Sequence, residues 1–258
     1  RDRWLIGGQD HATLEATVKR MTAGPMSAYE QDDENDPTEY EMWGDVAVIP
    51  VHGVLGRGLD DFDRMCGGVD TEEVKAAIRL CNMDAKVESI VLSLRSPGGM
   101  VTGTPELARA IANSGKTVAA WVDSQACSAA YWLASQCSMV CASPTAHVGS
   151  VGVYIALLDM SRMLENEGIK VNAMSAGKMK LAGHSWKPLT DDEREMFQEM
   201  VDETAAEFHA AVREGRGPVA LSPGVFEARV FSGEKAGDAG RVDYHFDDLE
   251  EMLSDMVL

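Results

Sequence analysis

Ala126-Cys127-Ser128-Ala129-Ala130-Tyr131-Trp132-Leu133-Ala134 connects a strand-like run, Thr117–Val122, to an alanine-rich helical pattern. This join places Ser128 at the start of a helix, where unpaired backbone N–H groups and the helix dipole favour negative charge. A serine in that position can act as a nucleophile. It can also simply cap the helix, because serine is a preferred N-cap residue. Taken alone, the stretch favours the cap.

Two further stretches change that balance. Upstream, the buried strand 90–95 leads into Ser96-Pro97-Gly98-Gly99-Met100. Paired glycines let a backbone approach a ligand closely and present the N–H groups of an oxyanion hole, although a tight turn explains them equally well. Downstream, 175–180 contains two lysines. A lysine can serve as the base for a serine once desolvation has lowered its pKa from about 10.4 towards about 7–8, but most lysines are solvated surface charges.

Together the stretches resemble the signal peptide peptidase A family (S49) of serine proteases. They look closest to its short, anchor-free branch, which includes tailed-phage head-maturation proteases. The family usually has glycines after its nucleophile, where this chain has Ala129 and Ala130, a change of one methyl group each. The matching stretches keep the family's order over most of the chain, and they are 46–53, 96–99, 127–135, 148–153, 175–180 and 231–236.

The resemblance implies a catalytic dyad in which Ser128 is the nucleophile and Lys180 is the general base. Ser150 is the candidate to orient the lysine, although a turn serine between two glycines is the plainer interpretation. Two other bases stay open. Lys178 lies two residues before Lys180, so strand alternation puts both on one face. His147 is a rival because Clp-type proteases use a histidine after the serine, but no orienting acid stands out beside it.

The resemblance also implies how substrate is held. The oxyanion hole is expected at the backbone N–H groups of Gly99 and Ala129, with Gly98 as a further member. Met100 and Val101, just after the glycines, are expected to pair with an extended substrate strand. Cys127 is a rival nucleophile beside Ser128, although a small buried neighbour is the simpler interpretation.

Composition excludes several function classes. The chain has 258 residues, 45% hydrophobic content and a net charge of −19, which indicates a soluble protein and argues against nucleic-acid and anionic-membrane partners. No apolar run approaches the ~18–20 residues of a membrane anchor. Five cysteines without a Cys-x-x-Cys pair indicate reduced thiols in a cytosol-like compartment. The six histidines are scattered, so we expect no metal and no cofactor.

The chain is expected to divide into an N-terminal arm and a protease domain. Residues 1–45 are expected to form an N-terminal arm with a short helix near 12–21 and an acidic linker at 30–45, which is either solvated or docks on a basic partner or a neighbouring subunit. The sequence lacks an initial Met and a signal-peptide core, so we expect it to begin inside a longer product.

Residues 46–258 are expected to form the protease domain. Alternating strands and helices predict an α/β fold with a mostly parallel sheet covered by helices. The resemblance implies the ββα spiral shared by Clp proteases and crotonases. The predicted strands are 46–51, 89–95, 117–122, 139–142, 151–157 and 169–174. The predicted helices are 70–81, 105–114, 128–136, one ending at Gly168, 191–214, and three short pieces within 221–258. A capping box, Thr190 to Glu193, is predicted to open the helix 191–214.

The resulting hypothesis is a serine endopeptidase that cuts scaffold and capsid-associated proteins in a phage prohead or the host cytoplasm. In compact members of the family the serine and the lysine come from adjacent protomers of a ring, so we expect a homo-oligomer with a shared dyad. The alternatives are a bacterial cytosolic peptidase that clears signal-peptide remnants, a crotonase-type acyl-CoA enzyme, and a non-catalytic shell or scaffold protein.

Overall fold

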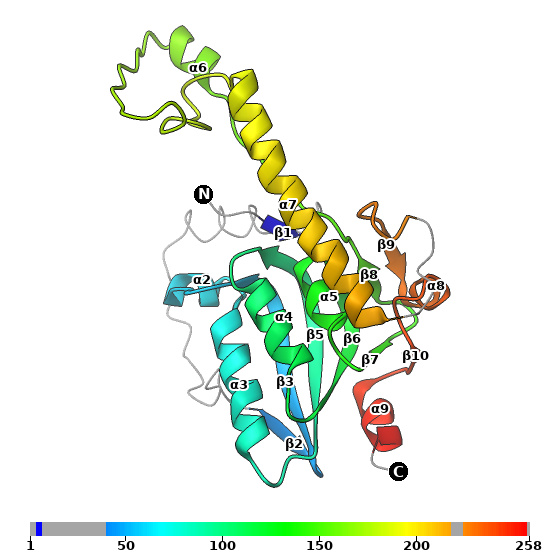
Figure 1. Ribbon diagram of the computed structural model, residues 1–258. Helices are drawn as coiled ribbons and strands as arrows, with labels where there is room; N and C mark the ends of the chain where they lie inside the picture. Colours follow the sequence, from blue (N-terminus) through cyan, green and yellow to red (C-terminus); the bar gives the residue numbers. More distant parts are fainter. Residues whose placement is uncertain (1–3, 7–39, 218–223, 257–258) are drawn as a thin grey trace.

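The computed structural model describes residues 4–6, 40–217 and 224–256. Its centre is a sheet of parallel strands in the order β7-β6-β5-β3 (Figure 1). Their bounds are β3 (Val46–Gly56), β5 (Ser89–Met100), β6 (Thr117–Cys127) and β7 (Met139–Ala142). Three short strands add parallel pairs: β4 (Gly68–Asp70) on β3, β8 (His147–Gly149) on β6, and β10 (Tyr244–His245) on β7. The antiparallel strands are β1 (Trp4–Ile6) on β5, β2 (Glu41–Trp43) on β3, and β9 (Val230–Ser232) on β8.

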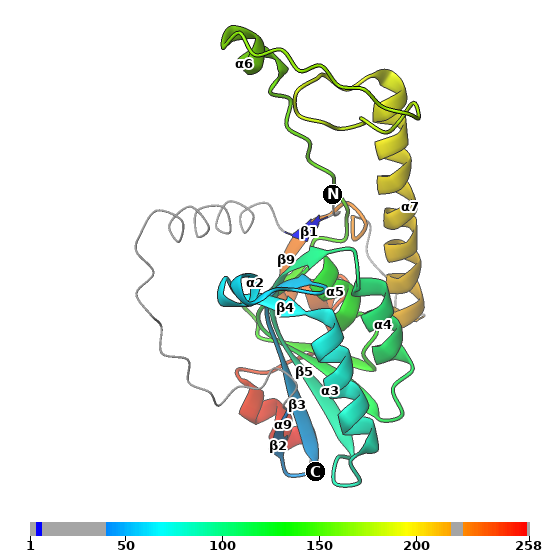
Figure 2. The same cartoon turned by 90° about the vertical axis from the view of Figure 1, so that its left-hand side faces the viewer.

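Helices cover both faces of the sheet, which explains why its central strands are apolar on both sides. One face packs against α3 (Thr71–Met83), α4 (Thr104–Ala112) and α5 (Ala129–Ala134) (Figure 2). The other face packs against α9 (Leu249–Met256), with Met252 and Leu253 against Val91 and Trp121. The α/β prediction with a mostly parallel sheet is therefore confirmed. The remaining helices are α2 (Asp61–Met65), α6 (Ser161–Asn166), α7 (Asp191–Arg216) and α8 (Gly233–Asp238).

The strands that lead to the site run further than predicted. The sequence predicts that β5 ends at 95 and β6 at 122, where polar residues interrupt the apolar pattern. In the structure β6 instead shifts register after Val122, so that Leu94 pairs with Val122 but Arg95 pairs with Gln125. Past this irregularity β6 exchanges β7 for β8 as its outer neighbour. The extension carries the chain directly to Ser128.

Residues 155–190 project from the N-terminal end of α7, away from the sheet (Figures 1 and 2). This segment, which is separate from the N-terminal arm, is called the arm from here on. The capping box predicted at the start of α7 is confirmed, because the Thr190 hydroxyl accepts from the Glu193 N–H and the Glu193 carboxylate accepts from the Thr190 N–H. The predictions of strands at 151–157 and 169–174 are wrong. The segment 151–157 runs into the arm and 169–174 lies within it, where the central sheet offers no neighbouring strand, and the short strand β8 lies at 147–149 instead.

The first 45 residues are described only in part. The predicted helix near 12–21 and most of the acidic linker lie outside the described residues. The end of the predicted linker forms β2, and β1 precedes it. Of the helices in the described ranges, none combines the length and the apolar character needed to cross a membrane.

An aromatic stack joins the C-terminal half of α7 to the core, together with the buried Val212 and the Arg216–Asp243 ion pair. The rings of Trp132 in α5 and Phe208 in α7 lie 4.6 Å apart at an angle of 5°, and both side chains are buried.

Phe208→Ala should therefore lower the free energy of unfolding by about 3–5 kcal/mol, because it leaves a cavity beside Trp132. The control Glu203→Ala changes an exposed residue of the same helix and should stay within about 0.5 kcal/mol of the wild type. Urea unfolding measures both. A loss below about 1 kcal/mol for Phe208→Ala would show that α7 is not anchored by this stack.

Candidate active site

Pairing between β5 and β6 brings the two stretches singled out in the sequence together. Ser96 pairs with Ala126 in parallel register, so the next residues of each strand run side by side. Gly98 lies two residues beyond Ser96, and Ser128 lies two residues beyond Ala126. The carboxyl ends of neighbouring parallel strands therefore place the paired glycines beside the serine.

Ser128 has a backbone conformation that residues with a side chain rarely adopt, with φ 53° and ψ −120°. Such conformations cost about 1–3 kcal/mol and persist only where the surrounding structure enforces them. Here the Ser128 N–H donates to the Gly149 carbonyl at 2.7 Å, which fixes the turn between β6 and α5. The side chain makes no capping hydrogen bond, and its Oγ donates to the Gly152 carbonyl at 3.4 Å. Ser128 therefore begins α5 without capping it.

Residues with a strained backbone are concentrated around Ser128. Among the described residues, the non-glycine residues with positive φ are Ser128, Ser150 and Ala228. The Ser150 N–H donates to the carbonyl of Arg229, the residue after Ala228, at 2.9 Å. Ser150 directly follows the glycine that binds the Ser128 N–H, so the 149–152 turn wraps the serine. This concentration of strain is typical of functional sites.

The paired glycines are required by the fold itself. Gly98 has φ 106°, and a Cβ at Gly99 would lie inside contact distance of the Leu55 carbonyl in β3. The Gly98 N–H donates to Ser96 Oγ at 3.2 Å, which makes Gly98 the least suited of the three predicted oxyanion donors. Ala129, in the first turn of α5, is fully buried.

The predicted substrate-pairing residues differ in their surroundings. Met100 ends β5 and pairs with Trp4 of β1. The Val101 side chain packs in the main core. Met100 therefore lies in a backbone ladder beside the glycines, whereas the Val101 side chain is buried in the core.

Both candidate lysines lie on the arm, near the start of α7. Lys178 forms an ion pair with Asp192, in the first turn of α7, and this carboxylate raises the pKa of Lys178. Lys180 is two residues further along and is exposed. From Asp191 to Phe208, where α7 meets α5, is about 25 Å along the helix axis at 1.5 Å per residue. Because Ser128 lies at the start of α5, the structure does not bring the lysines and the serine together within one chain.

The other rivals occupy separate places. His147 is exposed on β8, beside Gln125 of β6. Cys127 is buried, and its thiol donates to the His147 carbonyl at 3.7 Å. In the described ranges, no group of three or more His, Cys, Asp or Glu side chains is arranged to hold a metal ion.

One residue of the site's support was missed by sequence reasoning. Arg241 is fully buried, its guanidinium lies 4.7 Å from the Phe231 ring and 5.3 Å from the Tyr131 ring, and it donates to the Val225 carbonyl. A side chain at Gly149 would collide with this guanidinium. Arg241 thus fills the space behind the turn that binds Ser128. Arginine is normally a surface residue, so its sequence gives no signal for this role.

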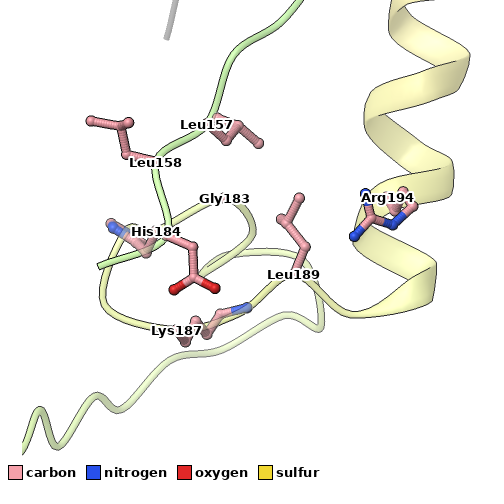
Figure 3. Close-up of a pocket in the computed structure, with 8 residues that line it drawn as sticks. Leu157, Leu158, Gly183, His184, Lys187, Leu189 and Arg194 are labelled. Carbon is pink, nitrogen blue, oxygen red and sulfur yellow. The ribbon is translucent and has the colours of Figure 1, made fainter. Parts of the chain in front are cut away.

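A pocket lies in the arm and not at the serine. Figure 3 shows it between the segment 157–159, the loop 183–189 and the first turn of α7. None of the predicted site residues lines it.

Comparisons with known proteins show which proteins the whole chain is similar to. The chain is 32% identical over 246 residues to the capsid assembly protease C of Escherichia phage lambda, covering 92% of this chain and 54% of that protein. It is 28% identical over 206 residues to the head-tail preconnector protein GP5 of Enterobacteria phage P21, covering 79% and 41%. It is 28% identical over 212 residues to protease 4 of Salmonella typhi, covering 80% and 33%. The chain spans about half the length of these relatives, or less.

Among solved structures, an enoyl-CoA hydratase/isomerase family member matches with a TM-score of 0.46 and 15% identity, covering 85% of this chain and 74% of that chain. The model of the family described as "Peptidase family S49" matches residues 110–255. This range includes the Ser128 turn, the arm and α7, and it is more than half of the chain. The chain therefore belongs to peptidase family S49.

Proposed function

We propose that this chain is a serine endopeptidase whose working site joins Ser128 of one subunit to Lys180 of a neighbouring subunit. The observation that carries the proposal is the separation of the two residues. Ser128 is buried in the core in a strained turn, whereas Lys180 is exposed at the far end of α7. A second copy can supply the missing partner without any change in the fold.

The chemistry follows from these groups. Ser128 Oγ attacks the substrate carbonyl, and the Lys180 amine takes the hydroxyl proton. The N–H groups of Gly99 and Ala129 receive the oxyanion, and losing one such donor typically costs about 2.7–4 kcal/mol. The lysine returns the proton to the leaving amine, and water hydrolyses the acyl-enzyme. In this proposal Ser150, in the turn that wraps Ser128, orients the lysine amine.

Electrostatics favour Lys180 over Lys178 as the base. A general base must give up its own proton before it can accept one. The Asp192 carboxylate raises the pKa of Lys178 and so keeps that ammonium protonated. His147 is a weaker rival because a histidine base normally needs an orienting carboxylate, and no acid stands out in the sequence around it.

The arm has the surface expected of an interface between subunits. It carries exposed apolar side chains, including Met174, which is 94% exposed, and Leu158, which is 78% exposed. Met163, Ile169 and Val171 add to this surface. Exposed apolar groups on a projecting segment mark a contact with another protein. A head-to-tail contact repeated around a closed ring would place each arm over the next subunit's serine.

For the substrate we propose scaffold and capsid-associated proteins of a phage head, processed in the prohead or in the host cytoplasm. The support is that two of the relatives carry phage capsid-assembly and head-tail names. Protease 4 of Salmonella typhi keeps a bacterial peptidase as the second candidate. Cleavage of purified scaffold protein, with no cleavage of free signal peptides, would favour the phage role.

Ser128→Ala should abolish peptide cleavage and labelling by a fluorophosphonate, because it removes the proposed nucleophile. It should change the free energy of unfolding by less than about 0.5 kcal/mol, because the hydroxyl does not cap α5 and makes only a long hydrogen bond, 3.4 Å, to the Gly152 carbonyl. The matched control is Thr190→Ala, which removes a capping hydroxyl and should cost about 1 kcal/mol. Cleavage that persists in purified Ser128→Ala protein would rule out Ser128 and point to Cys127.

Lys180→Ala should lower kcat/KM by at least about 10³-fold, whereas Lys178→Ala should keep activity within about threefold. Mixing the inactive Ser128→Ala and Lys180→Ala proteins and letting them reassemble should restore part of the activity. Some junctions then regain an intact serine and an intact lysine. If native mass spectrometry confirms mixed oligomers and no activity returns, the shared site is excluded.

A further inference from the structure

β1 pairs with the stretch of β5 that contains the paired glycines. Its register is antiparallel, with Trp4 opposite Met100, Leu5 opposite Gly99 and Ile6 opposite Gly98. On their other side, Gly98 and Gly99 already pair with Val54 and Leu55 of β3. β1 therefore takes the only remaining backbone edge of these two residues.

This edge opens because β6 leaves it. β6 pairs with β5 as far as Ser96 and Ala126, and the chain then turns at Ser128 into α5. Beyond Ser96, β5 thus continues past its former neighbour and exposes its ladder beside the serine. β1 fills the place that β6 has left.

The direction of β1 matches that of a bound substrate. A substrate must present a carbonyl group to Ser128, and its preceding residues must run away from the serine along the neighbouring strand. Because β1 is antiparallel to β5, its carboxyl end lies at Gly98, nearest the Ser128 turn, and its amino end lies at Met100. An added strand in this direction is the ordinary way in which a sheet edge binds an extended peptide.

We propose that β1 is a built-in competitor of the substrate, which occupies the substrate edge of β5 and must leave before a substrate strand can pair there. The proposal rests on the proposed function of Ser128. The pairing involves three residues of β1, whereas β5 and β6 pair over eight positions. So short a ladder is suited to release, and its attachment to the same chain gives it a high effective concentration at the site.

The test compares two triple variants of the full chain. One carries Trp4→Pro, Leu5→Pro and Ile6→Pro, which removes the N–H groups that a ladder needs. Its matched control carries Trp4→Ala, Leu5→Ala and Ile6→Ala, which loses the same side chains and keeps the N–H groups. Both are made with Ser128→Ala, so that binding is measured without cleavage. The probe is a fluorescent peptide with the sequence of residues 1–8, and its binding is followed by anisotropy.

The proline variant should bind the peptide at least about tenfold more tightly than the alanine variant, because its edge is free. Hydrogen exchange should show the amides of 98–100 that face β1 to be more protected in the alanine variant than in the proline variant, whereas the Gly98 N–H, which donates to Ser96 Oγ, should exchange alike in both. Equal affinities within twofold, with both variants folded by circular dichroism, would overturn the proposal.

The two hypotheses fail separately. With Ser128 intact, the proline variant should raise kcat/KM on a peptide substrate about tenfold over the alanine variant, mainly through a lower KM. If the binding difference appears but no variant cleaves peptides, occupation of the edge stands and the proposed function fails. If cleavage is present and the binding difference is absent, the competitor role alone is wrong.

Discussion

The backbone of Ser128 is the constraint on which the candidate site depends. Its positive φ is unfavourable for a residue with a side chain, and the fold holds it through the hydrogen bond from Ser128 N–H to the Gly149 carbonyl. Gly149 is held in turn by its pairing with Cys127 and by the buried Arg241 behind it. The Ser128 hydroxyl therefore does not cap α5, and its position is set by packing that is present before a substrate binds.

The same sheet explains why the glycines and the serine meet while the lysine does not. Parallel pairing aligns the carboxyl ends of β5 and β6, so residues that are about 30 positions apart in sequence share one edge. The lysines follow a segment that leaves the sheet altogether and returns only through α7, whose first half stands clear of the core. In the proposed ring, each chain would receive the arm of one neighbour at its serine and would extend its own arm to the serine of the other neighbour, as a head-to-tail ring requires.

Much of this was predictable from local patterns. Apolar runs located the central strands, and Thr190 with Glu193 located the start of α7, because both signals act over a few residues. The strands wrongly predicted at 169–174 and 151–157 have suitable composition but no neighbour, and pairing cannot be deduced from composition. Arg241 was missed for the same reason, since only the tertiary structure reveals what surrounds a buried charge. The pairing of β1 with β5 joins segments more than 90 residues apart, and no local pattern predicts it.

Cross-linking tests directly the claim that the arm of one subunit reaches the serine of another. Chains carrying Ser128→Cys and Cys127→Ser are mixed with chains carrying Lys180→Cys and Cys127→Ser, reassembled, and oxidised. The claim predicts a disulfide-linked pair containing one chain of each kind, absent when either variant is oxidised alone. A double variant that forms the link within a single chain, or a mixture that forms none although mixed oligomers are present, would contradict it.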